Sequence, residues 1–176
     1  MAEYLVFADS DDATIVKGGT IDDVGPNSDP SLQVHAPGQT AYLVPQGTLA
    51  WPGINLEPMR AAMTAKVDTA AEAFRLNFIT PGAGQAMTYA YKASEVKAWE
   101  ADNTVPTPFL TAEATARGMT VADLAAEAGA QITAWITIGS KIEGARMGAK
   151  AAITAATTVP AMARAGNVDW AALASS

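Results

Sequence analysis

The segment from residue 121 to residue 157 constrains the fold more than any other, because it contains no proline and repeats apolar residues at helical spacing throughout. Ala128, Trp135, Ile142 and Ala149 recur at intervals of seven residues. A helix of this length extends roughly 50 Å at about 1.5 Å per residue. We therefore expect one long helix near the C-terminus to organise the fold.

An apolar stripe on this helix is the predicted packing or oligomer seam, and it consists of Leu124, Ala128, Trp135, Ile138, Ile142, Ala149 and Ile153. The same helix contains Gly139, Gly144 and Gly148, each of which costs about 1 kcal/mol relative to alanine in a helix interior. These glycines indicate close helix approach or a local kink. Two interpretations stay open: tight packing within one chain, or a seam between identical chains, with which the heptad spacing is compatible.

A second helical pattern follows the WPG turn at residues 51–53, where the apolar period changes from two to about 3.6. Asn55 is the expected N-cap, and Pro58 fits the first turn. The apolar face of this helix consists of Met63, Val67, Ala70, Phe74 and Phe78. A proline and a glycine end it, and the predicted helix-break motif consists of Pro81, Gly82, Gly84 and Gln85.

Two further helices are expected before the long one. The first carries Met87, Ala90, Tyr91, Ala93, Ser94, Val96 and Trp99 and ends at a polar interval over 102–108. The second covers residues 110–117, with Gly118 as a left-handed C-cap. Thr120 and Asp123 then resemble a capping box at the start of the long helix.

Before residue 51, short runs of β-branched and aromatic residues alternate with turn-forming residues. The expected strands are Tyr4–Phe7, Thr14–Val16, Leu32–His35 and Thr40–Val44. The sequence thus predicts an α+β fold: a small N-terminal β meander or hairpin pair, then an α-helical bundle with one long C-terminal helix. We predict a β-rich docking unit over 1–53, too small to be stable alone, and a helical bundle and oligomerisation region over 54–176.

Composition excludes several classes of partner. Eleven Lys and Arg against eighteen Asp and Glu give a net charge of -7, which repels a phosphate backbone, so no nucleic-acid partner is expected. No signal-peptide pattern and no apolar window long enough for a membrane span occur, so no membrane partner is expected. Aromatic residues make up only 7% of the chain, and we expect so thin a core to need help from partner chains.

The acidic run Asp9, Asp11 and Asp12 superficially resembles a calcium loop. Such a loop needs an oxygen ligand at its fifth position and glycine at its sixth, where this chain has Ala13 and Thr14. We interpret the run as a charged hairpin turn. Because the chain also has no cysteine and a single histidine, we predict no metal site and no cofactor.

No catalytic set is predicted either. His35 ends an expected strand, Ser140 lies in mid-helix rather than in a nucleophile elbow, and the PGAGQ run lacks the lysine of a phosphate-binding loop. The acidic residues weighed as glycosidase carboxylates are Glu95, Glu100, Glu113, Glu127 and Glu143, which are spread over different helices. The tryptophans weighed as a sugar platform are Trp99, Trp135 and Trp170, which are more simply core residues.

Three pieces of the chain carry a resemblance. They are DTAAEAFRLNFITPGAGQAMTYAYKASEVKAW at 68–99, TAEATARGMTVADLAAE at 111–127 and AWITIGSKIEGARMGAKAAITAATT at 134–158. Within them, the PGAGQ break, a Tyr-x-x-Lys segment at 89–92 and a W-x-x-I-G-x-x-I-E-x-x-R spacing at 135–146 occur together. This pattern resembles a helical region of proteins encoded near the tail-fibre genes of tailed bacteriophages and prophages of proteobacteria.

The resemblance implies a virion structural or fibre-associated protein without known catalytic residues, made in the bacterial cytoplasm. We expect a non-enzymatic component of a tail fibre, spike or head decoration. Its expected partners are itself, with a trimer as the natural guess for a fibre, and other phage structural proteins. Two alternatives stay open: a tail-fibre assembly chaperone that is absent from the finished particle, and an enzyme that degrades envelope polysaccharide.

Overall fold

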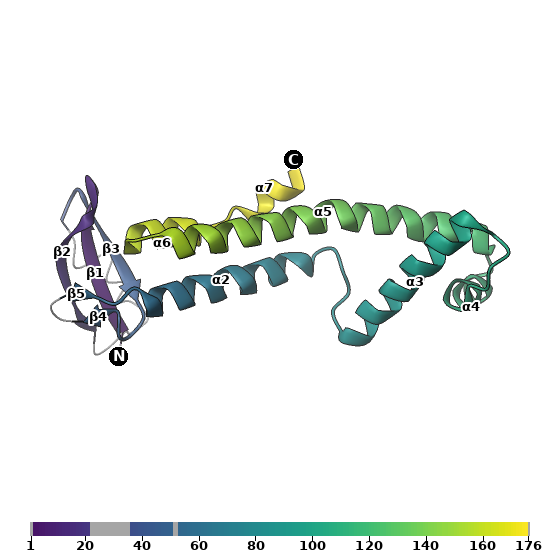
Figure 1. The fold of residues 1–176 in the computed structure, drawn as a ribbon, viewed down its shortest axis with the longest axis horizontal. Helices are drawn as coiled ribbons and strands as arrows, with labels where there is room; N and C mark the ends of the chain where they lie inside the picture. Colours follow the sequence, from purple (N-terminus) through teal and green to yellow (C-terminus); the bar gives the residue numbers. More distant parts are fainter. Residues whose placement is uncertain (1, 22–35, 51–52, 176) are drawn as a thin grey trace. The chain divides into compact units, whose positions relative to one another are not determined.

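The computed structural model describes residues 2–21, 36–50 and 53–175. Along the chain, a small antiparallel sheet is followed by helices, and the longest helix lies near the C-terminus (Figure 1). The predicted α+β fold class is therefore confirmed. The chain divides into two compact units, which we describe separately. Unit 1 comprises residues 1–71 and 144–169, and unit 2 comprises residues 72–143 and 170–176.

Unit 1 contains a three-stranded antiparallel sheet in the order β2-β1-β3, with strands β1 (Ala2–Ala8), β2 (Asp11–Ile21) and β3 (Gln39–Val44). A two-stranded ladder of β4 (Leu49–Ala50) and β5 (Gly53–Ile54) belongs to the same unit. The central strand β1 pairs on both edges and is buried from Glu3 to Phe7. Three of the predicted strands lie within β1, β2 and β3, whereas Leu32–His35 lies outside the described residues.

A tight turn joins β1 to β2 at the acidic run. Asp11 accepts a hydrogen bond from the backbone N–H two residues later at 2.8 Å, and Asp9 accepts one from the hydroxyl of Thr40 at 2.6 Å. Asp12 forms an ion pair with Arg164. The prediction of a charged hairpin turn is therefore confirmed.

Unit 1 also contains α6 (Val159–Ala165) and parts of α2 (Glu57–Arg75) and α5 (Val121–Ala155), because the division between the units falls inside these two long helices. Its core consists of Leu5, Phe7, Val44, Met59, Val159 and Met162. The sheet therefore shares one hydrophobic core with the start of α2 and with α6. The docking and oligomerisation roles assigned to residues 1–53 and 54–176 stay predictions.

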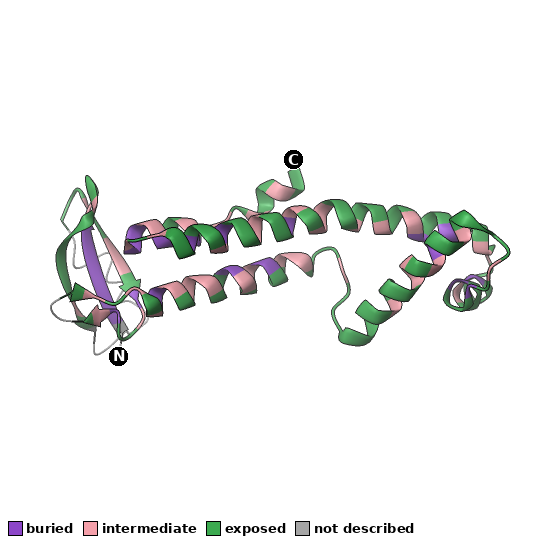
Figure 2. Ribbon diagram, in the orientation of Figure 1, coloured by how far each residue is buried: buried purple, intermediate pink, exposed green. Residues whose placement is uncertain are grey.

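Unit 2 contains α3 (Ala83–Ala101), α4 (Pro108–Arg117) and α7 (Trp170–Ser175), together with the remainder of α2 and α5. Its core consists of Val96, Leu110, Ala114, Leu124, Ala125 and Ala128. Four of these six residues are alanine or valine, so this core is built mostly from small side chains. Figure 2 shows that most of α3 is exposed or only partly buried.

Local sequence signals set several helix ends as predicted. Gly118 has a φ of 66° and ends α4 in the left-handed conformation that favours glycine. The backbone N–H of Asp123 donates to the hydroxyl of Thr120 at 3.1 Å, and that hydroxyl donates to the Asp123 carboxylate at 2.7 Å. The capping box therefore starts α5 at Val121.

The helix expected to continue through Phe78 ends at Arg75 instead, and a turn follows over residues 76–78. There the side-chain amide of Asn77 donates to the carbonyl of Phe74 at 3.1 Å, which satisfies one of the free carbonyls at the helix end. Gly82 has a φ of 123° just before α3 begins. The helix break is confirmed, but it begins earlier than the proline that predicts it.

Candidate functional site

Most of the predicted seam residues on α5 are buried by other parts of the same chain. Leu124 and Ala128 pack in the core of unit 2. Ile142, Ala149 and Ile153 are also buried, whereas Trp135 and Ile138 are half-buried. The structure thus gives these side chains a packing role, and contact with another chain stays a prediction for them.

The glycines of α5 differ in what surrounds them. A Cβ atom at Gly139 would meet the ring of Trp135 on the same helix at 3.3 Å. At Gly144 and Gly148, no atom of the described chain outside the local helix backbone lies within 4 Å of an added Cβ. Tight packing within one chain therefore does not explain these two glycines.

The helix-break residues bring no chemical groups together. Pro81, Gly82, Gly84 and Gln85 are all exposed, and no side chain caps the start of α3 at Gly82. An added Cβ at Gly82 or Gly84 would meet nothing within 4 Å. These residues separate α2 from α3 and do not line the groove described below.

The most unusual surface lies on α3, which buries only Val96 among its 19 residues. Met87 is 59% exposed and Tyr91 is 55% exposed. The ring of Tyr91 stacks on the ring of Phe109 from α4, with centroids 5.5 Å apart and planes 3° from parallel. The large apolar side chains of Met87, Tyr91 and Phe109 are therefore exposed to water. Covering them with a partner surface would lower the free energy.

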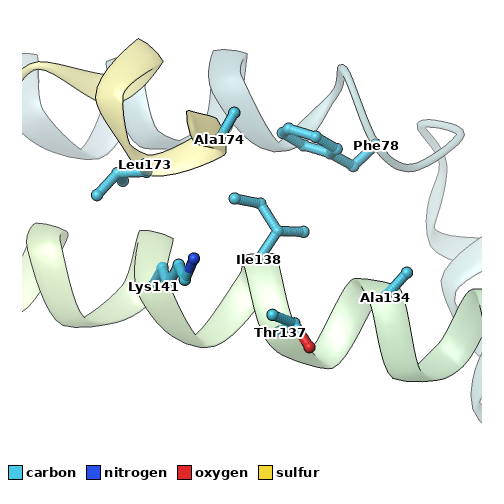
Figure 3. Close-up of a pocket in the computed structure, with 7 residues that line it drawn as sticks. All are labelled: Phe78, Ala134, Thr137, Ile138, Lys141, Leu173 and Ala174. Atoms are coloured by element: carbon cyan, nitrogen blue, oxygen red, sulfur yellow. The ribbon is translucent and has the colours of Figure 1, made fainter. Parts of the chain in front are cut away.

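A shallow groove in unit 2, with a cavity volume of about 350 Å³, is lined by Phe78, Ala134, Thr137, Ile138, Lys141, Leu173 and Ala174 (Figure 3). Its lining is largely apolar, and it brings together no carboxylate, imidazole or thiol. Ligand sites usually combine apolar walls with several convergent polar groups. This groove has the lining of a contact surface rather than that of a reaction centre.

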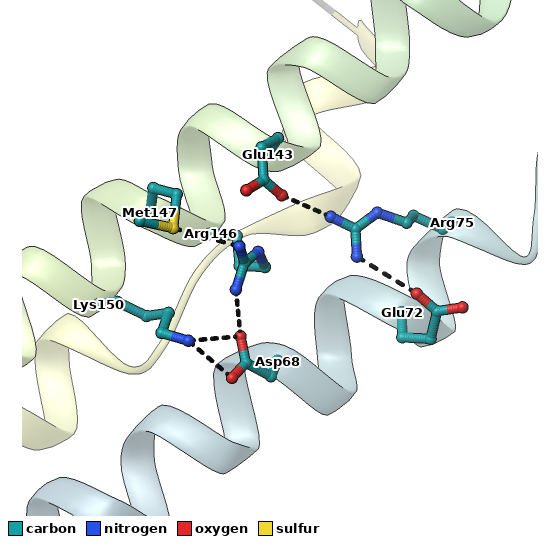
Figure 4. A network of polar contacts seen from close by, with 7 residues as sticks. All are labelled: Asp68, Glu72, Arg75, Glu143, Arg146, Met147 and Lys150. Carbon is teal, nitrogen blue, oxygen red and sulfur yellow. Dashed lines mark hydrogen bonds and ion pairs between the residues drawn. The ribbon is translucent and has the colours of Figure 1, made fainter.

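Ion pairs connect α2 and α5 in each unit (Figure 4). In unit 1, the carboxylate of Asp68 accepts hydrogen bonds from Lys150 at 2.8 Å and from Arg146 at 2.6 Å. These hydrogen bonds hold the pKa of Asp68 below its ordinary value. In unit 2, Arg75 contacts Glu72 at 3.3 Å and Glu143 at 2.8 Å. These carboxylates therefore serve as structural anions.

The carboxylates weighed as glycosidase groups mostly have structural partners as well. Lys92 donates to Glu113 at 2.6 Å, and Arg117 pairs with Glu127 at 2.7 Å. These hydrogen bonds lower the pKa of both carboxyl groups, Glu113 mainly through Lys92 and Glu127 mainly through Arg117. A general acid in sugar cleavage needs a raised pKa, so the shift has the wrong sign for that role.

Glu95 has a different structural role. Its carboxylate accepts hydrogen bonds from the backbone N–H groups of Phe109 at 3.1 Å and Leu110 at 2.9 Å, at the start of α4. Thr107, the residue at the N-cap position, makes no side-chain capping bond. A side chain of α3 thus caps the next helix.

The buried carboxylate of Glu3 is a structural group too. Burial alone would raise the pKa of Glu3, but the backbone N–H groups of Leu49, Gly47 and Thr48 outweigh burial and lower it. The bonds from Gly47 and Leu49 are 2.9 and 2.8 Å long. Glu3 therefore fastens the loop before β4 to strand β1.

The remaining candidates do not converge. Among the described residues, no group of three or more histidine or acidic side chains is arranged to hold a metal ion, and His35 itself lies outside them. Ser140 donates to the carbonyl of Thr137 within α5. Trp99 packs against the core of unit 2, and the ring of Trp170 lies 6.4 Å from that of Phe74.

No protein-family model, curated protein or solved structure matches the chain. Within the described ranges, no helix has both the length and the apolar character needed to cross a membrane. A functional assignment therefore depends on the surfaces of the two units and on the sequence pattern.

Sequence reasoning missed the exposed face of α3, although its signal is present in the sequence. It assigned Met87, Tyr91, Val96 and Trp99 to one apolar set, but these residues lie on different sides of the helix. Val96 and Trp99 pack in the unit 2 core, whereas Met87 and Tyr91 are exposed. Placing each residue at 100° intervals around the helix separates the two sides.

Proposed function

We propose that the chain is a non-enzymatic structural component of a tailed-phage particle, in a tail fibre, spike or head decoration. It acts by self-association and by docking on other structural proteins of the particle. The resemblance of residues 68–158 to phage fibre-associated proteins supports the phage assignment. The surface of α3 supports the assembly role.

The observation that carries the assembly role is the exposure of α3. This helix has about five turns but only one buried residue, whereas most of the stability of a helix in a protein comes from packing of its apolar face. Met87 and Tyr91 leave large apolar area exposed on it. A second protein surface that covers α3 would supply the missing packing.

The acidic side chains support a structural role over sugar cleavage. Glu95 caps a helix, and Glu113, Glu127 and Glu143 are in ion pairs. The ion pairs lower the pKa of Glu113 and Glu127, which is the wrong direction for a group that must donate a proton near neutral pH.

Mass spectrometry of purified particles from the encoding phage or prophage tests this proposal. After density-gradient purification, we expect the chain at a fixed ratio to the fibre and capsid proteins, while a replication protein serves as a control for contamination. A chain that co-purifies with unassembled fibre but is absent from particles would be an assembly chaperone. A chain found with neither would contradict a role in the particle.

The docking role of residues 1–53 has its own test. Deleting these residues would expose the unit 1 core, so substitutions at exposed strand positions are the better probe. Val16 on β2 and Leu43 on β3 are both exposed. If the sheet docks on another particle protein, Val16→Lys or Leu43→Lys lowers incorporation without lowering the melting temperature of the free chain.

A further inference from the structure

One line of residues along α3 has the spacing of a two-helix seam. The positions alternate at intervals of three and four residues, and they are Gly84, Met87, Tyr91, Ser94, Ala98 and Ala101. All six are exposed, and none is charged. Such spacing is the a/d pattern of paired helices. We call these six residues the α3 seam.

The opposite side of α3 already has a partner. Val96 and Trp99 pack in the core of unit 2, and the charged residues Lys92, Glu95 and Lys97 lie outside the seam. A helix with apolar residues on two separate sides is normally covered on both. Val96 is buried and Trp99 is half-buried, whereas all six seam residues are exposed.

The α3 seam is complementary to itself when two copies run antiparallel. In that register, Gly84 faces Ala101, Met87 faces Ala98 and Tyr91 faces Ser94. The two larger side chains each meet a small one, which avoids the clash of two large residues in one layer and favours close packing, and only the outer layer of Gly84 and Ala101 is thin. The same register repeats the three layers on both sides of a two-fold axis, as a symmetric dimer requires.

Parallel pairing fits less well. It places Tyr91 against Tyr91 and Met87 against Met87, and it leaves Ser94, Ala98 and Ala101 in thin layers. It also brings Lys97 near Asp102, but the Asp102 carboxylate already accepts hydrogen bonds from the backbone N–H and hydroxyl of Thr104 at 2.9 and 2.7 Å. An exposed ion pair adds little stability, so packing decides the direction.

Charge also allows the antiparallel pair. The chain carries a net charge of -7, so two copies repel one another, and acidic pairs at the contact surface would add to this repulsion. In the antiparallel register, the flanking residue Glu95 lies near Thr88 and Lys97 lies near Ala90. No like charges meet along the seam. Phe109, which stacks on Tyr91, adds apolar area at its edge.

We propose that α3 pairs antiparallel with α3 of a second copy of this chain, along the α3 seam. The proposal rests on the proposed function, because the pairing supplies its self-association surface. The pair itself can form without a phage particle. The seam is roughly 26 Å long at about 1.5 Å per residue, which is a small contact. The pair therefore dissociates on dilution.

Disulfide trapping tests the direction and register, because the native chain contains no cysteine. In the double variant Met87→Cys/Ala98→Cys, the two thiols of one chain lie roughly 16 Å apart along the helix, too far for a bond within the chain. We expect the double variant to form a covalent dimer under mild oxidation, and each single variant to remain monomeric. Cross-linking of the single variants would show parallel pairing and overturn the register.

A matched control excludes random collision. Tyr89→Cys/Glu100→Cys has the same spacing on another side of α3, where both residues are exposed. We expect little or no covalent dimer from it. Equal yields from this control and from the seam variant would overturn the proposal.

Sedimentation over a range of concentrations gives an independent readout. Ser94→Lys places a charge in the central layer without removing a buried group, and Gln85→Lys places the same charge at an exposed position on the side of α3 away from the seam. We expect wild type and Gln85→Lys to approach twice 18.1 kDa, and Ser94→Lys to dissociate at least tenfold more easily. Equal dissociation of the two lysine variants would overturn the pairing.

The two proposals fail separately. If purified particles contain the chain but neither trapping nor sedimentation detects the α3 pair, the pairing is wrong and the structural role survives. If the α3 pair forms but no particle or fibre contains the chain, the pairing survives and the role in the particle is wrong.

Discussion

The carboxylate of Glu95 accepts a hydrogen bond from the backbone N–H of Leu110 at 2.9 Å, so that a residue of α3 caps the start of α4. The first N–H groups of a helix lack partners within it, and its N-terminus carries a partial positive charge. Glu95 supplies both an acceptor and a negative charge there. The start of α4 therefore depends on α3 being folded.

We expect Glu95→Ala to lower the free energy of unfolding by about 1 kcal/mol, the usual value of an N-cap side chain. Glu95→Gln retains an acceptor oxygen and loses less. Urea denaturation measures both variants, with Glu100→Ala, at an exposed position of the same helix, as the control. If Glu95→Ala and Glu100→Ala are equally stable, the cap contributes nothing.

The C-terminal end of α5 is capped by Arg60 from α2. Its guanidinium donates to the carbonyl of Ile153 and, at 2.8 Å, to that of Thr154. Arg60→Met keeps most of the side-chain bulk but removes these charged hydrogen bonds, and we expect a loss of about 2 kcal/mol. We also expect Arg60→Met to speed hydrogen exchange of the backbone amides in the last turn of α5. Lys66→Met, at an exposed position of α2, is the control and should change stability by less than about 0.5 kcal/mol.

Features encoded by neighbouring residues could be predicted from the sequence. The capping box of Thr120 and Asp123 and the left-handed cap at Gly118 each depend on residues within a few positions, and the structure contains both. The end of α2 at Arg75 was missed because the helix stops before the later proline, at a turn where the Asn77 side chain donates to the carbonyl of Phe74.

Contacts between distant segments could not be predicted in this way. Arg60 and Thr154 are far apart in sequence, and so are Asp68 and Lys150, and only the folded chain shows that they meet. The exposed face of α3 is an intermediate case. The spacing of its residues is visible in the sequence, but periodicity alone does not show which of the two apolar sides of the helix is buried.

Two side chains of equal size on α5, Leu124 and Ile136, differ strongly in burial. Leu124 is 1% exposed within the unit 2 core, whereas Ile136 is 62% exposed. We expect Leu124→Ala to cost about 3 kcal/mol, because it removes buried area and leaves a cavity. Ile136→Ala should cost less than about 0.5 kcal/mol. Denaturant titration measures both, and a similar loss for the two variants would contradict the burial assigned to Leu124.

Acid should weaken unit 1 through Asp68. Hydrogen bonds from Lys150 and Arg146 lower the pKa of Asp68 in the folded chain. A carboxyl group with a lowered folded pKa stabilises the fold above its unfolded pKa of about 3.9, and this contribution is lost as pH falls through the folded pKa. The effect is modest because Asp68 is partly exposed.

We therefore expect wild type to lose more stability than Asp68→Asn between pH 7 and pH 3. Melting temperatures of both proteins at the two pH values measure this difference. Glu100→Gln, at an exposed position of α3, is the control and should follow wild type. An equal loss in Asp68→Asn and wild type would show that the ion pair contributes no stability.

Two glycine substitutions should change stability in opposite directions. Gly118 has a φ of 66°, so Gly118→Ala forces alanine into the left-handed region and should cost about 1 kcal/mol. Gly148 lies in the interior of α5 with nothing within 4 Å of an added Cβ, so Gly148→Ala should gain about 1 kcal/mol through helix propensity. Thermal melting at low protein concentration measures both. Because the proposed pairing uses α3, Gly148→Ala should not change the dissociation constant of the dimer. Weaker association of this variant would show instead that the glycines of α5 face a second chain.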